Sequence, residues 1–206
     1  QGNALALNNL AFLRRSTGGA DQALPILRDL TARLPSYPDP WLNTAEIERA
    51  EGNGEAAIAS YVRYLDLRPR DLRAAEALSG LYAAERRFAE AEAVYEATLR
   101  GDSIDARIWN NIGAVRLLKD DIEGATEAVE RALTIDPAYP RARFNLGKLL
   151  AVAGREAAGR AIFEALVREA PASDIGAAAA RELARPPDGE IETDAPGPGM
   201  SENPRP

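Results

Sequence analysis

Four prolines, Pro35, Pro69, Pro137 and Pro171, are separated by multiples of 34 residues along this chain. A 34-residue frame that places these prolines at position 32 begins its units at residues 4, 38, 72, 106 and 140. Position 8 of these units is always Ala, Ser or Gly, and position 20 is always Ala or Gly. Small residues that recur at one period indicate an internal repeat, and this repeat constrains the fold more than any other feature.

Each unit of the frame is predicted to form two antiparallel helices joined by a short polar turn. The middle of four units contains turn-forming residues, at Gly18-Gly19, Gly52-Asn53-Gly54, Asp120-Asp121 and Gly154. Small residues at positions 8 and 20 let the two helix axes approach, and large residues at positions 7, 24 and 28 fill the space beside them. The proline at position 32 cannot continue the second helix. A single unit cannot bury its apolar stripe alone, so five units are expected to stack.

Composition supports packed helices and excludes several classes of function. The chain of 206 residues is 46% hydrophobic but only 6% aromatic, and its net charge is −7. An acidic chain is poorly suited to nucleic acid, which requires clustered positive charge. Because Cys and His are absent, we expect no disulfide, no metal site of the usual zinc type and no cofactor. No apolar run approaches the roughly 18 residues of a membrane span, so no direct membrane insertion is expected.

The repeat resembles the tetratricopeptide repeat (TPR) family. The resemblance rests on the 34-residue period, the small residues at positions 8 and 20, the aromatic or aliphatic residue at 24 and the proline at 32. The fragments that match most closely are Trp41, Ala45, Ala57, Tyr61 and Pro69, and Trp109, Ile112-Gly113, Ala125, Ala132 and Pro137. Positions 11 and 27 depart from the family pattern in most units. The resemblance implies an all-α fold, an α-solenoid of five helix-turn-helix units in a right-handed superhelix.

The expected boundaries follow from this frame. The array is assigned to residues 1–185, with repeats at about 4–37, 38–71, 72–105, 106–139 and 140–173, and a C-terminal capping helix at about 174–185. Ala4 begins the first repeat without an equivalent N-terminal cap, which suggests that further sequence precedes Gln1. Residues 186–206 are rich in Pro, Gly and acidic residues, so this tail is expected to be disordered.

The resemblance implies that the first helix of each unit builds a concave groove, with positions 2, 5, 6, 9, 12 and 13 facing it. Six asparagines fall at positions 5 and 6: Asn8, Asn9, Asn43, Asn110, Asn111 and Asn145. We interpret them as a row of exposed amides that pair with the backbone of an extended peptide. Mid-helix Asn is about 0.5–0.7 kcal/mol less favourable than Ala, which favours a functional role. The alternative is that Asn is a common consensus residue at position 6, and Ala77 interrupts the row.

A basic row is predicted along the same groove. Its members are Arg73, Arg107 and Arg141 at position 2, and Lys148 at position 9. Guanidinium groups in a row can bind the carboxylates of an acidic peptide. The alternative is that these arginines are solvated and pair with neighbours such as Asp71, Glu76 and Asp105.

The function predicted from these patterns is a non-catalytic protein–protein interaction scaffold that binds an extended, acidic peptide or partner segment in the groove. No nucleophile–base pair, phosphate-binding loop or metal cluster is apparent in the sequence. The alternative is a C-terminal substrate- or partner-docking TPR arm of a larger enzyme, such as a glycosyltransferase or hydrolase. The oligomeric state stays open.

Overall fold

The computed structural model describes residues 2–99 and 104–185, and within these ranges it contains eleven α-helices and no strand. The predicted all-α class is therefore confirmed, whereas the predicted disordered tail, residues 186–206, lies outside the described residues. The helices are α1 (Gly2–Ser16), α2 (Ala20–Arg33), α3 (Pro38–Ala50), α4 (Gly54–Leu67), α5 (Leu72–Ala84), α6 (Phe88–Leu99), α7 (Ala106–Leu118), α8 (Ile122–Ile135), α9 (Pro140–Val152), α10 (Glu156–Glu169) and α11 (Asp174–Ala184). None of these helices is long and apolar enough to span a bilayer.

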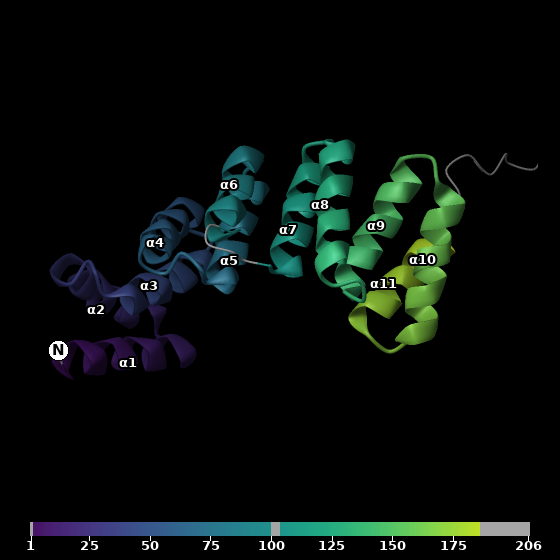
Figure 1. Ribbon diagram of the computed structural model, residues 1–206. Coiled ribbons are helices and arrows are strands. Elements are labelled where there is room, and N and C mark those ends of the chain that lie inside the picture. The colour runs from purple at the N-terminus through teal and green to yellow at the C-terminus, as the bar shows by residue number, and fades with distance from the viewer. Residues whose placement is uncertain (1, 100–103, 186–206) are drawn as a thin grey trace, which may run out of the picture.

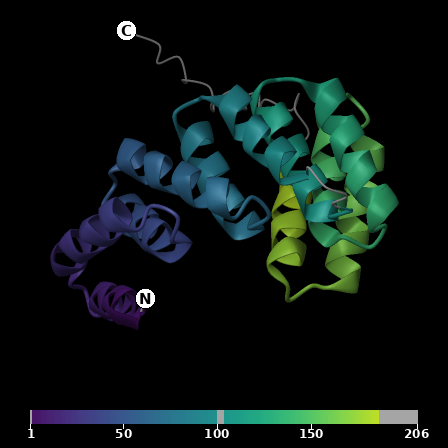
Figure 2. The same ribbon diagram turned by 60° about the vertical axis from the view of Figure 1, so that its left-hand side comes forward.

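Neighbouring helices pack in pairs, and the pairs follow one another along an elongated, curved array (Figures 1 and 2). Within each pair, from α1–α2 to α9–α10, the two helices share their most extensive contacts with each other. Each second helix also packs against the first helix of the next pair, as α8 does against α9. α11 packs against α10 and α9, so it occupies the place that the first helix of a further pair would take.

The turn inside each unit has one recurring backbone conformation. Position 15 of the frame has a positive φ in every unit, at Gly18, Gly52, Arg86, Asp120 and Gly154. Glycine adopts this left-handed region without steric cost, whereas Arg86 and Asp120 adopt it despite a Cβ. The predicted turns therefore lie where the glycines indicate, and the same geometry is kept where glycine is absent.

Small residues at positions 8 and 20 allow a helix contact that a larger side chain would prevent. A Cβ atom added to Gly113 of α7 would lie 2.7 Å from a methyl group of Val129 in α8. One added to Gly159 of α10 would lie 2.5 Å from the carbonyl oxygen of Gly147 in α9. These distances are shorter than van der Waals contact, so the spacing of these helix pairs depends on the missing side chain. The packing role predicted for positions 8 and 20 is confirmed at these contacts.

The apolar core is a row of clusters rather than one central core. The buried residues form four clusters along the array, and the largest, which includes Tyr61, Leu78 and Ile112, joins α3 through α8. The last cluster packs Phe163 and Leu166 of α10 against Ala179 of α11. Such an arrangement is expected of stacked repeats, in which each unit buries its apolar stripe against its neighbours.

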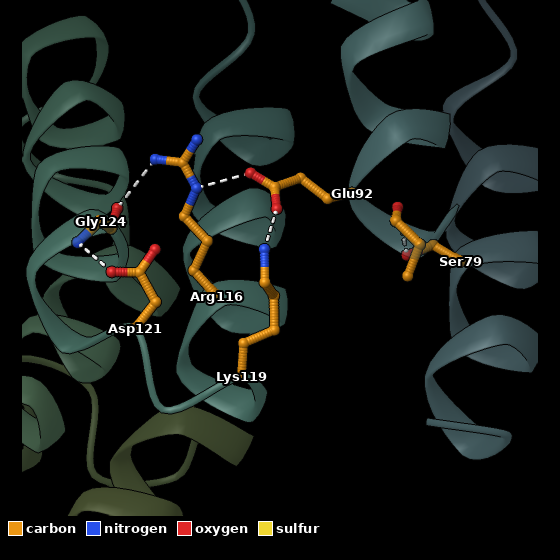
Figure 3. Close-up of polar contacts among 7 residues, drawn as sticks. Ser79, Glu92, Arg116, Lys119, Asp121 and Gly124 are labelled. Atoms are coloured by element: carbon orange, nitrogen blue, oxygen red, sulfur yellow. Dashed lines mark hydrogen bonds and ion pairs between the residues drawn. The ribbon is translucent and has the colours of Figure 1, made fainter. Parts of the chain in front are cut away.

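One buried carboxylate links the third helix pair to the fourth (Figure 3). Glu92 of α6, whose side chain is only 12% exposed, accepts hydrogen bonds from Arg116 Nε at 2.7 Å and Lys119 Nζ at 2.9 Å. Arg116 also donates to the carbonyl oxygen of Gly124 in α8, at 3.1 Å. Burial alone would raise the pKa of Glu92, but the hydrogen bonds from Lys119 and Arg116 outweigh it and lower the pKa.

Adding one methyl group at the tightest helix contact tests the packing. Gly159→Ala should lower the unfolding free energy by about 1–3 kcal/mol, because the new Cβ meets a backbone carbonyl that cannot rotate away. Gly80→Ala is the matched control, since nothing lies within 4 Å of the added Cβ. It should raise the unfolding free energy by up to about 1 kcal/mol, as Ala favours helix over Gly. Urea unfolding followed by circular dichroism measures both; equal effects of the two variants would contradict the contact.

The buried carboxylate predicts a pH-dependent stability. Because folding lowers the pKa of Glu92 below its ordinary value of 4.5, its stabilisation is present above that value and is lost as the pH falls through the folded-state pKa. Glu92→Gln should therefore lower the unfolding free energy by roughly 1–2 kcal/mol at pH 7. The difference from the unmodified protein should shrink as the pH is lowered from 7 towards 3, because the stabilisation is lost as Glu92 becomes protonated.

Glu96→Gln is the control for this experiment, since Glu96 lies on the same helix, is exposed and forms no ion pair within the described ranges. It should change stability little at either pH. A deficit of Glu92→Gln that is as large at pH 3 as at pH 7 would show that the carboxylate charge is not what stabilises this junction.

Candidate functional site

Hydrogen-bonded side chains connect the first helices of successive pairs. Three such bonds each join residues that are 35 positions apart, one period plus one residue. Position 6 of one unit donates to position 5 of the unit before it, and we call each such pair of positions a rung. The polar rungs are Asn43 Nδ2 to Asn8 Oδ1 at 2.9 Å, Asn111 Nδ2 to Glu76 Oε1 at 3.0 Å, and Asn145 Nδ2 to Asn110 Oδ1 at 2.8 Å.

The rungs correct the expectation that the amides are exposed. Asn8, Asn43 and Asn110 are only 5%, 9% and 1% exposed, and each satisfies another amide. Asn110 is engaged on both sides of its amide, because its Oδ1 accepts from Asn145 and its Nδ2 donates to Asn111 Oδ1 at 3.3 Å. Asn9 is exposed, whereas Asn111 and Asn145 are half-buried. Contact of any of these amides with a partner stays a prediction.

The basic row is also not uniform. The guanidinium of Arg107 is bound to the carboxylate of Asp105, with Nη2 and Oδ2 2.6 Å apart, and its hydrogen bonds lower the pKa of Asp105. The neighbour pairing considered as an alternative is therefore present at Arg107. Arg73 and Arg141 are exposed and form no ion pair within the described ranges. Lys148 lies apart from Arg73, on a cleft of about 750 Å³ between α9, α10 and α11.

A second cleft, of about 370 Å³, lies where α1, α3 and α5 converge. It brings two predicted site residues, Asn43 and Arg73, together with residues that the sequence analysis did not assign to the binding site. The added lining residues are Phe12, Arg15, Leu42, Glu46, Arg49, Tyr61, Asp71, Ala74 and Ala77. Most of them fall at positions 5, 6, 9 and 12 of the frame, so the groove positions implied by the TPR resemblance could have identified them.

The two sets of helices differ in charge. The first helices of the pairs, α1, α3, α5, α7 and α9, carry nine Arg or Lys and four Asp or Glu. The second helices, α2, α4, α6, α8 and α10, carry six Arg or Lys and thirteen Asp or Glu. The first helices together therefore carry a net positive charge in a protein whose net charge is −7. Within the described residues no cluster of three acidic side chains is placed to hold a metal ion.

Family models described as tetratricopeptide repeat match residues 8–72 and 76–140, and a second such model matches residues 116–182. The chain belongs to the tetratricopeptide repeat family. The resemblance seen in the sequence is thus confirmed, and the stacked pairs form a TPR α-solenoid. The number of complete TPR units, five, stays a prediction.

Solved structures of other TPR proteins have the same fold. MamA, residues 41 to the end, from Desulfovibrio magneticus RS-1 is 19% identical, with a TM-score of 0.69 over 84% of this chain and 98% of that one. A TPR protein from Parabacteroides merdae is 18% identical, with a TM-score of 0.73 over 89% of this chain and 73% of that one. At these identities the likeness extends to the fold alone.

A curated relative places a similar sequence inside a longer protein. The general transcriptional corepressor trfA of Dictyostelium discoideum is 22% identical over 125 residues, or 60% of this chain. The chain spans only 9% of the length of that protein.

A single substitution tests whether the buried amides hold the TPR units together. Asn110→Ala should lower the unfolding free energy by about 1–3 kcal/mol, because it leaves a donor of Asn145 without its buried acceptor. Asn9→Ala should change stability by less than about 0.5 kcal/mol, since Asn9 is exposed. The double variant Asn110→Ala/Asn145→Ala should cost less than the sum of the single variants. Additive losses in urea unfolding would show that the two amides do not interact.

Proposed function

We propose that this TPR array is a non-catalytic protein-interaction scaffold that binds an extended, acidic segment of a partner along the wall built by its first helices. The fold is that of a protein-interaction scaffold. The proposal of an acidic partner along the first helices is supported by the charge separation. The first helices carry nine basic and four acidic residues, whereas the second helices carry six basic and thirteen acidic residues.

The charge separation favours one wall over the other for an acidic ligand. A carboxylate-rich segment is attracted to the first-helix wall and repelled by the second-helix wall. Arg73 and Arg141 are the strongest candidates on that wall because neither has a carboxylate partner within the described ranges. Arg107 would first have to give up Asp105. An unpaired guanidinium can bind a carboxylate through two parallel hydrogen bonds.

An extended conformation suits the spacing of the helices. Packed helix axes lie roughly 8–10 Å apart, and an extended chain advances about 3.3 Å per residue. A bound segment would therefore pass one first helix about every three residues. A segment of roughly 15 residues could contact all five of the first helices, because stacked repeats present one continuous surface.

Peptides of opposite charge test the proposal. We consider two fluorescein-labelled 15-residue peptides that alternate Ser with either Glu or Lys around a central Phe. The Glu peptide should bind at least tenfold more tightly by fluorescence anisotropy, and its affinity should fall as NaCl is raised, because salt screens exposed charges. Arg73→Glu should weaken binding of the Glu peptide about tenfold, or about 1.4 kcal/mol.

Arg168→Glu is the matched charge reversal, because Arg168 is exposed on α10, a second helix. It should change the affinity less than twofold. Equal weakening by both variants would mean that net charge and not the first-helix wall determines binding. Equal affinity for the Glu and Lys peptides would contradict the proposed acidic partner.

A further inference from the structure

The rungs between successive first helices are polar at three junctions and apolar at two. The apolar rungs are Leu42–Ala77, between α3 and α5, and Phe144–Ala179, between α9 and α11. At the second apolar rung the space is filled, since Phe144 packs in the cluster that contains Ala179 and its ring lies 5.4 Å from the ring of Phe163.

The rung between α3 and α5 lies at a cleft. Leu42 and Ala77 both line the cleft of about 370 Å³, and no amide reaches across it. α3 and α5 also approach each other less closely than α1 and α3, α5 and α7, or α7 and α9 do. The cleft volume is roughly ten times the ~30 Å³ that one water molecule occupies in the liquid. A large side chain can therefore enter where a polar rung is missing.

Part of the lining of this cleft is apolar, beside the charged and polar residues that contribute about as much of its surface, and the ring of Phe12 is poorly covered. Phe12 of α1 is 51% exposed although it is a large apolar residue, and Leu42 of α3 is half-buried. Ala74 and Ala77 of α5 contribute only methyl groups to the lining. An apolar side chain placed among these groups would remove apolar surface from water on both partners.

The rim of the cleft is basic, and its own acids are already engaged. Glu46 is paired with Arg15. Asp71 accepts from the Tyr64 hydroxyl at 2.6 Å and from the backbone N–H of Ala74 at 3.2 Å. Neither carboxylate is paired with Arg73, which therefore remains available to a carboxylate from outside.

We infer that the Leu42–Ala77 cleft is an anchor site, which takes one large apolar side chain of the partner segment while Arg73 binds a carboxylate next to it. This inference rests on the proposed function and names the chemistry that would locate the acidic segment on the wall. The ligand is an acidic peptide with a single Phe or Leu, and not an acidic segment of any composition.

Replacing only the central residue of the Glu peptide tests the anchor. The peptide with a central Phe should bind the complete chain about tenfold or more tightly than the same peptide with a central Ala, measured by fluorescence anisotropy. Equal affinities for the two peptides would overturn the anchor site and leave the acidic-peptide proposal standing. If neither peptide binds, the proposed function fails and the anchor site fails with it.

Exchanging the apolar rung residues for asparagines, a rung exchange, tests whether the preference for the Phe peptide depends on this cleft. Leu42→Asn combined with Ala77→Asn places the residues of the Asn8–Asn43 rung at this junction and replaces part of the apolar lining of the cleft with amides. It should bind the Phe and Ala peptides with equal affinity. If the variant unfolds more readily, Phe12→Ala gives a second measurement, because it opens one wall of the cleft and should reduce the preference for Phe at least threefold.

Val152→Asn is the matched control, because Val152 is an exposed apolar residue that lines the other cleft, between α9, α10 and α11. It should leave the preference for Phe unchanged. A preference that disappears in Val152→Asn but persists in both the rung exchange and Phe12→Ala would overturn the assignment and place the anchor at the C-terminal cleft.

Discussion

The close approach of paired helices at positions 8 and 20 is the constraint on which the array depends. Where Gly113 faces Val129, or Gly159 faces the carbonyl of Gly147, even one Cβ exceeds the available space. This contact sets how the second helix lies on the first, and so it sets which face of each first helix meets the next pair. Stacked pairs then bury their apolar residues in successive clusters, since no unit has a core of its own.

The rungs add register to this packing. An apolar contact between units tolerates a small slip, whereas a buried amide that loses its partner is left unsatisfied. Asn43 with Asn8 and Asn145 with Asn110 are such pairs, and both join residues 35 apart. The helix propensity that Asn loses relative to Ala, about 0.5–0.7 kcal/mol, is therefore offset by a hydrogen bond that only the correct stacking forms.

Much of this fold could be predicted from the sequence because it repeats. The period, the small residues and the turn glycines each recur, so the helix pairs followed from the 34-residue frame. The burial of the asparagines did not follow from the frame. Asn110 is buried and bonds to Asn145 of the next unit, and a frame that aligns units does not show which positions of neighbouring units meet. The spacing of 35 residues could have been found by comparing position 5 of one unit with position 6 of the next unit. The cleft could not, because the 34-residue frame does not show how closely α3 and α5 approach each other.

A repeat surface that binds an extended segment has to prevent that segment from sliding by one unit. Identical units would offer several equivalent registers, each with the same charges and the same spacing. In this TPR array arginine recurs at position 2 in the last three units, as Arg73, Arg107 and Arg141, so an acidic segment could meet the same charge in more than one register. The Leu42–Ala77 rung breaks that equivalence, because the other apolar rung is filled by Phe144. An apolar anchor at this one junction would convert a general attraction for acidic chains into binding at a single register.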